Sequence, residues 1–241
     1  MEIIKFNLSG LGASFTRPSF NSVISTYSHI HKISLLGILG AIIGIDKTSY
    51  TNTKYSLPPF YKELKDLKIG IVPKETLFPN NFTTITCTNG FANKSSNFVQ
   101  NYELLINPSW DIYIYKNENK HYEKIKEYLL NKNAYFIPYL GRNHWYADIN
   151  NVEILNGDFV NECEYINGLF KETDIEIEDE DDDFDFDLEK EDIYFKEYMP
   201  TKFKEKGFIQ YIEEPLVITN RKVISCRKPI LNCDNKNIYL I

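Results

Sequence analysis

A long stretch without carboxylates constrains this chain most. No aspartate or glutamate occurs in residues 3–45, although the 241-residue chain contains 34 acidic residues. The stretch predicts an alternating strand over residues 1–8, a loop punctuated by Gly10 and Gly12, and then an apolar helix. A strand, a loop and a helix in this order are typical of proteins that mix helices with sheets.

The predicted helix begins at Lys32 or Ser34. A stripe of small residues follows at helical spacing: Gly37, Gly40, Ala41 and Gly44. Each interior glycine costs a helix about 1 kcal/mol relative to alanine, so the stripe predicts close packing of this helix on a sheet. The free N–H groups at the helix start, beside His29 and Lys32, predict an anion site. From the residues alone, a glycine-rich strand, loop and helix without any site is an equally good interpretation.

The order of these residues resembles a known family. The matching segments are GLGASF (residues 10–15), Arg17-Pro18, Thr26-Tyr27, Lys32, LLGILGAIIGI (35–45), PYLGRNHWYA (138–147) and Tyr198-Met-Pro200. Together they resemble the Cas-five family, the RAMP-type CRISPR-associated subunits of type I Cascade complexes, and type I-B is the most similar variant. The chain departs from the family pattern at His31 or Ile30, where proline is usual, and at Ser34, where threonine is usual.

The remaining pattern predicts the α+β class. Strands are expected at residues 68–72, 83–88, 102–106, 110–115, 135–138, 147–155, 162–166, 208–217 and 222–226, and helices at 61–67 and 119–131. The order β-α-β-β-α-β over residues 1–146 is the split βαβ plan. The resemblance implies the same fold, a ferredoxin-like (RRM-like, RAMP) domain with an inserted β-hairpin thumb at about 73–101. A small β-rich C-terminal region is expected over 147–241.

Net charge is distributed unevenly along the chain. The whole chain carries −7, but residues 172–192 contain 14 acidic residues and one lysine. The remaining residues include 20 acidic and 26 basic ones, so the body is mildly basic. The acidic run is expected to be a flexible loop, because like charges repel and extend a chain. It is either a solvated insertion or a strip that docks on a basic partner.

The resemblance implies a non-catalytic CRISPR RNA-binding subunit of a type I Cascade effector complex, used in antiviral defence. Such a subunit holds the five-prime handle of the crRNA and caps the backbone filament. Its implied partners are that handle, a backbone (Cas-seven type) subunit and a large (Cas-eight type) subunit. The expected RNA-binding residues are Arg17, Thr26, Tyr27, His29, Lys32, Arg142 and Asn143. An arginine can fork onto a phosphate, and exposed polar and aromatic side chains can contact unpaired bases.

Two other functions remain open. Metal-independent RNA cleavage needs a base for the ribose 2′-hydroxyl and a cation or acid at the leaving oxygen. The segments Tyr27-Ser-His-Ile-His-Lys32 and Lys120-His-Tyr122 contain such residues, and some type I-C relatives cut precursor crRNA with tyrosine, lysine and histidine. A scaffold subunit without RNA contact is the third possibility. We expect no catalytic residues, no cofactor and no metal site.

The cysteines and the N-terminus indicate the cellular compartment in which the protein is expected. Cys87, Cys163, Cys226 and Cys233 form no C-x-x-C pair, so reduced structural thiols are expected. No signal peptide is recognisable, and the apolar run at residues 33–45 is shorter than the ~20 residues that span a bilayer. We therefore expect a soluble cytoplasmic protein that does not bind membranes.

Overall fold

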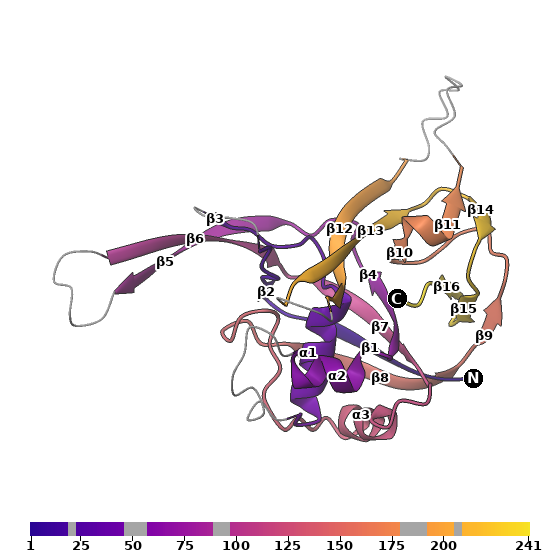
Figure 1. Ribbon diagram of the computed structural model, residues 1–241, viewed down its shortest axis with the longest axis horizontal. Coiled ribbons are helices and arrows are strands. Elements are labelled where there is room, and N and C mark those ends of the chain that lie inside the picture. The colour runs from indigo at the N-terminus through magenta and orange to yellow at the C-terminus, as the bar shows by residue number, and fades with distance from the viewer. Residues whose placement is uncertain (19–22, 46–56, 89–96, 179–191, 205–208) are drawn as a thin grey trace.

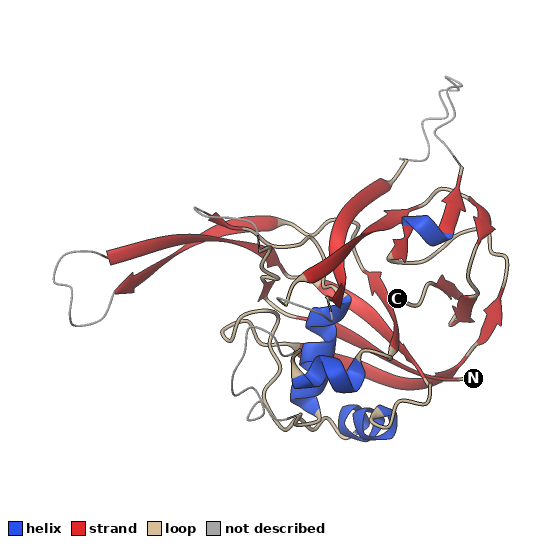
Figure 2. Ribbon diagram, viewed as in Figure 1, coloured by secondary structure: helices blue, strands red, loops and turns tan. Residues whose placement is uncertain are grey.

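The computed structural model describes residues 1–18, 23–45, 57–88, 97–178, 192–204 and 209–241. Within these ranges strands predominate, and three α-helices gather beside one sheet (Figures 1 and 2). The first part of the chain contains β1 (Glu2–Ser9), β2 (Gly12–Ala13), β3 (Val23–Ile24), α1 (Lys32–Ile42), α2 (Pro59–Leu64), β4 (Lys68–Pro73), β5 (Asn80–Thr88), β6 (Asn97–Ile106), β7 (Ser109–Tyr115) and α3 (Tyr122–Leu130).

In the described part of residues 147–241, the regular elements are strands, apart from one short turn. It contains β8 (Asp148–Asn156), β9 (Asp158–Val160), β10 (Phe170–Lys171), β11 (Ile175–Ile177), β12 (Tyr194–Phe203), β13 (Tyr211–Thr219), β14 (Val223–Cys226), β15 (Ile230–Cys233) and β16 (Lys236–Ile238), with a 3-10 turn at Glu172–Asp174. Every helix within the described ranges is too short or too polar to cross a membrane.

The central sheet has the strand order β4-β7-β1-β8, and all of its neighbouring strands are antiparallel. Strand β1 lies in the middle and is buried on both faces. Phe6 and Leu8 pack with the apolar residues of the helices, whereas Ile3 packs with Ile238 and Leu231 of the C-terminal strands. The chain thus covers both faces of this sheet, and β1 is more deeply buried than its alternating pattern suggests.

Helix α1 begins at Lys32, as predicted, but its small residues do not face a sheet. A side-chain carbon at Gly40 would come within 2.7 Å of the Cβ of Phe60, which is in α2. At Gly44, which has a positive φ of 75°, the nearest neighbour is the ring of Tyr135. The stripe therefore brings α1 close to another helix and to a loop, and the prediction that the stripe itself packs on a sheet is wrong.

The hairpin β5–β6 projects from the body of the molecule (Figure 1). Its nine cross-strand pairs run from Asn80↔Leu105 to Thr88↔Asn97, and β6 also pairs with β2 and β3. The strands predicted at 83–88 and 102–106 are therefore confirmed as parts of longer strands. The turn predicted at Asn89-Gly90 lies outside the described residues, as does most of the acidic run.

Two predicted strands are absent. Residues 135–138 and 162–166 are irregular. The N–H groups of Tyr135 and Phe136 donate to the carbonyl oxygens of Ile42 and Ala41 at the end of α1, at 2.8 and 3.1 Å, so they are not available to a sheet. The fourth strand of the central sheet is β8 instead. The boundary predicted between residues 146 and 147 therefore separates β8 from the sheet to which it belongs.

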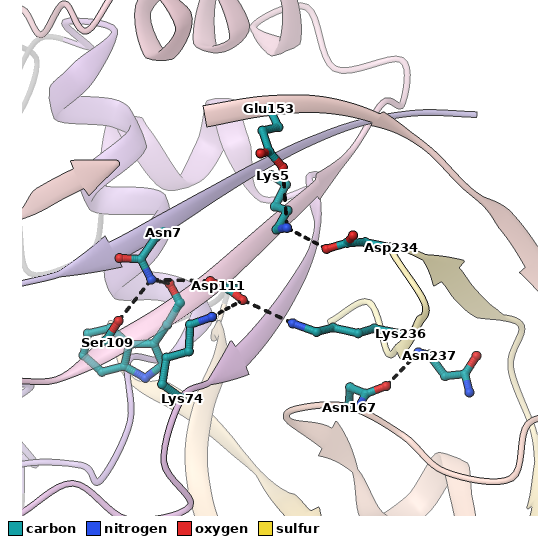
Figure 3. Close-up of polar contacts among 11 residues, drawn as sticks. Lys5, Asn7, Lys74, Ser109, Asp111, Glu153, Asn167, Asp234, Lys236 and Asn237 are labelled. Atoms are coloured by element: carbon teal, nitrogen blue, oxygen red, sulfur yellow. Dashed lines mark hydrogen bonds and ion pairs between the residues drawn. The ribbon is translucent and has the colours of Figure 1, made fainter. Parts of the chain in front are cut away.

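A polar network joins the C-terminal strands to the central sheet (Figure 3). Asp111 of β7 accepts hydrogen bonds from Lys74 at 2.6 Å and from Lys236 at 3.2 Å, and Lys5 of β1 binds Asp234 at 2.6 Å. Burial raises the pKa of the Asp111 carboxyl, but the bonds from the two lysines outweigh this effect and hold the pKa below its usual value. These contacts tie the β15–β16 hairpin to the sheet across their common interface.

Candidate nucleic-acid interface

The two glycine-containing motifs of the sequence pack against each other. The N–H of Ser14 donates to the carbonyl oxygen of Leu140 at 3.1 Å. A side-chain carbon at Gly12 would lie within 2.9 Å of the indole ring of Trp145. Gly141 has a φ of +83°, and because glycine has no side chain the carbonyl group of Ser14 can pack directly against it. The prediction that the loop at residues 141–145 lies near the first loop is confirmed.

This packing places Arg142 at the base of the β5–β6 hairpin. Its guanidinium carbon lies 3.5 Å from the centre of the Tyr102 ring, a cation–π contact with β6. The Nε atom of Arg142 is buried and has no hydrogen-bond partner in the described part of the chain. The adjacent side chains of Asn143 and His144 are exposed. Arg142 and Asn143 thus offer polar groups on a surface that the fold holds in place.

Arg17 lies on a second surface, a cleft of about 420 Å³ between the N-terminal loop and strands β12 and β13. Its Nε donates to the carbonyl of Thr26 at 3.1 Å, and its guanidinium carbon lies 5.0 Å from the centre of the Tyr27 ring. Glu197 forms an ion pair with Arg17. The charge of Arg17 is therefore partly balanced by the protein itself.

Thr26 and Tyr27 are buried beneath this cleft. The Thr26 hydroxyl accepts from the Phe15 N–H at 2.8 Å and donates to the Tyr27 carbonyl at 2.9 Å. The Tyr27 hydroxyl donates to Glu213, and burial together with this bond raises the pKa of Tyr27 well above its ordinary value. These two side chains hold the loop in shape, and they present little surface to a ligand.

His29 and Lys32 are also buried. His29 donates from Nε2 to the carbonyl of Thr76 at 2.8 Å, and burial lowers its pKa to about 4. The Lys32 amino group donates to a main-chain oxygen of Ile241 at 2.9 Å. Burial, followed by repulsion from nearby lysines, lowers the pKa of Lys32 to about 8. Neither side chain is placed on the surface where RNA contacts were predicted.

The anion site predicted at the start of α1 is already occupied by the protein. His31 caps the helix, because its Nδ1 accepts from the N–H of Ser34 at 3.3 Å. His31 is buried among the rings of Phe15, Tyr27 and Tyr211, and burial lowers its pKa to about 3. The sequence showed a basic loop before a helix, but not that the helix start faces the interior.

Sequence reasoning missed the partners that shape both surfaces. These are Tyr102 at the hairpin base and Glu197, Tyr198 and Glu213 around the cleft. Tyr102 lies 40 positions before Arg142, and Glu197 and Glu213 lie 180 and 186 positions after Arg17 and Tyr27, so no local spacing indicates these contacts. The Tyr198-Met-Pro200 segment was the one signal, since it adjoins Glu197.

The residues considered for RNA cleavage do not converge. His29 and His31 are enclosed, as described above. His121 and Lys120 both bind the Glu63 carboxylate, at 3.0 and 2.6 Å, and these bonds lower the pKa of Glu63. The Tyr122 hydroxyl points inward and is buried. Within the described ranges, no three histidine, cysteine, aspartate or glutamate side chains gather as a metal site would require.

Comparison with known proteins identifies the family. Residues 3–205 match the family described as CRISPR-associated protein (Cas_Cas5), so the chain belongs to this family. No curated protein is similar enough in sequence to count as a match.

Two solved structures share the fold at low sequence identity. One, described as a CRISPR RNA-guided surveillance complex, aligns with a TM-score of 0.53 and 16% identity over 92% of this chain and 91% of that chain. The other, a CRISPR protein from Archaeoglobus fulgidus, aligns with a TM-score of 0.51 and 11% identity over 99% of this chain and 98% of that chain. At these identities the likeness concerns the fold alone.

Proposed function

We propose that this chain is a non-catalytic crRNA-binding subunit of a type I, I-B-like, Cascade complex. In this role it holds the five-prime handle of the crRNA and caps the backbone filament, beside a Cas-seven type subunit and a Cas-eight type subunit. Membership of the CRISPR-associated family supports the setting. The order β1, α1, β4, β7, α3, β8 with sheet order β4-β7-β1-β8 supports a ferredoxin-like domain with a hairpin thumb.

The observation that carries the RNA-binding role is the position of Arg142. Two motifs far apart in the sequence pack together, and the result is an arginine stacked on a tyrosine at the base of a projecting hairpin. Its Nε has no partner in the described part of the chain, and Asn143 beside it is exposed. Arginine planes and exposed amides are the groups with which proteins contact phosphates and unstacked bases of RNA. Arg17 is a second contact, at the edge of the neighbouring cleft.

The test is binding of labelled crRNA to the purified subunit. Arg142→Ala should weaken binding about tenfold, which corresponds to ~1.4 kcal/mol, because a stacked and hydrogen-bonding cation is lost. Arg142→Lys should recover only part of the affinity, because an ammonium group lacks the planar fork. Arg227→Ala is the matched control, since this exposed arginine follows β14 and lies away from the hairpin. Equal affinity for Arg142→Ala and the wild type would favour a scaffold that makes no RNA contact.

The endoribonuclease remains the second candidate, on one observation. His121 and Lys120 share the Glu63 carboxylate at the surface, an arrangement that can orient a histidine base. Incubation of precursor crRNA without magnesium separates the two functions. We expect the RNA to stay intact; specific cutting that is lost in His121→Ala would establish cleavage instead.

A further inference from the structure

Two cysteine thiols lie close together in the C-terminal part of the structure. The Sγ atoms of Cys163 and Cys226 are 3.9 Å apart, although the residues are separated by 63 positions in the sequence. Both are free thiols. The sulfurs of a disulfide bond are ~2.05 Å apart, so these atoms need to approach by only about 2 Å.

The surrounding backbone holds both thiols in place. Val223, three residues before Cys226, donates its N–H to the carbonyl oxygen of Glu164 at 2.9 Å. Cys226 itself lies opposite Ile175 in the pairing of β14 with β11, which run side by side in Figure 1. The two segments are therefore joined directly next to the sulfurs. The fold keeps the thiols as neighbours.

The pair is also open to small molecules. Both cysteines are partly exposed and line a cleft of about 620 Å³ together with Glu162 and Ser225. Cys233 provides a contrast within the same region. Its side chain is buried, and its thiol donates to the carbonyl oxygen of Asn156 at 3.7 Å. A dissolved oxidant reaches the first pair and not the third thiol.

We propose that Cys163 and Cys226 form a reversible redox site whose oxidant is a small aliphatic disulfide. One protein thiolate attacks a sulfur of that disulfide, and one small thiol leaves. The second protein thiolate then attacks the protein-bound sulfur of the mixed disulfide and releases the second small thiol. The protein gains one S–S bond and loses two hydrogens, while the two electrons reduce the oxidant to two thiols.

The environment sets the speed of this exchange. Burial and the neighbouring Cys226 raise the pKa of the Cys163 thiol to about 12. Thiolate is the reacting form, so attack by the Cys163 thiol accelerates as pH rises. The bond would fasten the segment before β10 to β14, beside the strand that leads into the acidic run.

The experiment exposes the folded full chain, with Cys87 replaced by serine, to glutathione disulfide. Free thiols are then alkylated, and peptides are mapped by mass spectrometry without reduction. We expect a linked pair of peptides containing Cys163 and Cys226, about 2 Da lighter than the two reduced peptides together, and its loss after treatment with a dithiol. Cys233→Ser should form the same link.

Single-cysteine variants provide the decisive readout. In Cys163→Ser no second thiol can resolve the intermediate, so glutathione should remain attached to Cys226. The Cys87→Ser parent, which keeps both cysteines of the pair, should show little of this adduct. The proposal is overturned if this parent keeps glutathione on both cysteines, links either of them to Cys233, or stays unmodified. Serine is close in size to cysteine and both sites are partly exposed, so the variants are expected to fold.

Discussion

Lys32 carries an amino group into the interior, where it donates a hydrogen bond to a main-chain oxygen of Ile241 at 2.9 Å. Burial is the main cause of the lowered pKa of Lys32, which is about 8. The nearby cations of Lys68, Lys171 and Lys202 lower this pKa further. An unfolded chain would restore the ordinary value near 10.5. The folded protein therefore binds the proton of Lys32 more weakly than the unfolded chain does.

This difference predicts how stability depends on pH. The unfolded chain binds more protons at this position between about pH 8 and 10.5, so the contribution of Lys32 to stability rises with pH across that window. Relative to Lys32→Met, the free energy of unfolding of the wild type should increase by up to about 3 kcal/mol over this range. Urea titrations at several pH values measure the difference.

The comparison with Lys32→Met removes the contributions of the other titrating groups. Lys222→Met is the matched control for the loss of a lysine at an exposed position. A difference between the wild type and Lys32→Met that stays constant with pH would show that the amino group is not held in the interior.

At the scale of elements, helix α1 shows how one stripe of glycines can contain two different environments. At Gly37, a side-chain carbon would lie 3.8 Å from the ring of Phe60, an ordinary van der Waals distance. At Gly40, one turn further on, it would lie 2.7 Å from the Cβ of the same residue. Only the second glycine is required by the approach of α2.

Substitution by alanine should therefore have opposite effects at the two positions. Gly37→Ala should raise the free energy of unfolding by up to about 1 kcal/mol, because alanine is the better helix former and fits the space. Gly40→Ala should lower it by about 1–3 kcal/mol, because the helices must move apart. Urea denaturation measures both. If both variants gain stability, the close contact between α1 and α2 does not exist.

Periodicity located helix α3, which buries one apolar face, strand β7, in which Trp110, Ile112 and Ile114 share a face, and the start of α1. Periodicity failed where the backbone N–H groups of a segment donate hydrogen bonds to groups outside any sheet. Residues 135–138 have the composition of a strand, yet Tyr135 and Phe136 cap the end of α1. It also failed at His29 and Lys32, because polar side chains enclosed by distant strands look the same in sequence as exposed ones.

At the scale of the whole molecule, the N-terminal and C-terminal parts share one hydrophobic core. Phe6 and Leu36 belong to the same cluster as Leu216 and Ile230. Strand β8, which follows the predicted boundary, pairs with β1 along nearly its whole length. Regions that share a core and a sheet unfold together.

We therefore expect one cooperative unfolding transition. The chain has two tryptophans, and in Trp145→Phe the fluorescence reports on Trp110, which is fully buried in the central sheet. The urea midpoint measured by Trp110 fluorescence should coincide with the midpoint measured by far-UV circular dichroism, because the dichroism also follows the strands of the C-terminal part. A second step in the dichroism would instead reveal a C-terminal region that unfolds alone.

The hairpin β5–β6 is held largely by its own ladder of cross-strand pairs, and in its described outer part Thr84 and Asn101 are exposed. Adding or deleting one facing residue on each strand would change the length of the hairpin by ~3.4 Å. Because successive side chains point to opposite faces, only a change of two residues on each strand keeps every outer side chain on its original face. Evolution can thus tune how far this arm extends without repacking the interior. Length variation among relatives should fall there, in even increments.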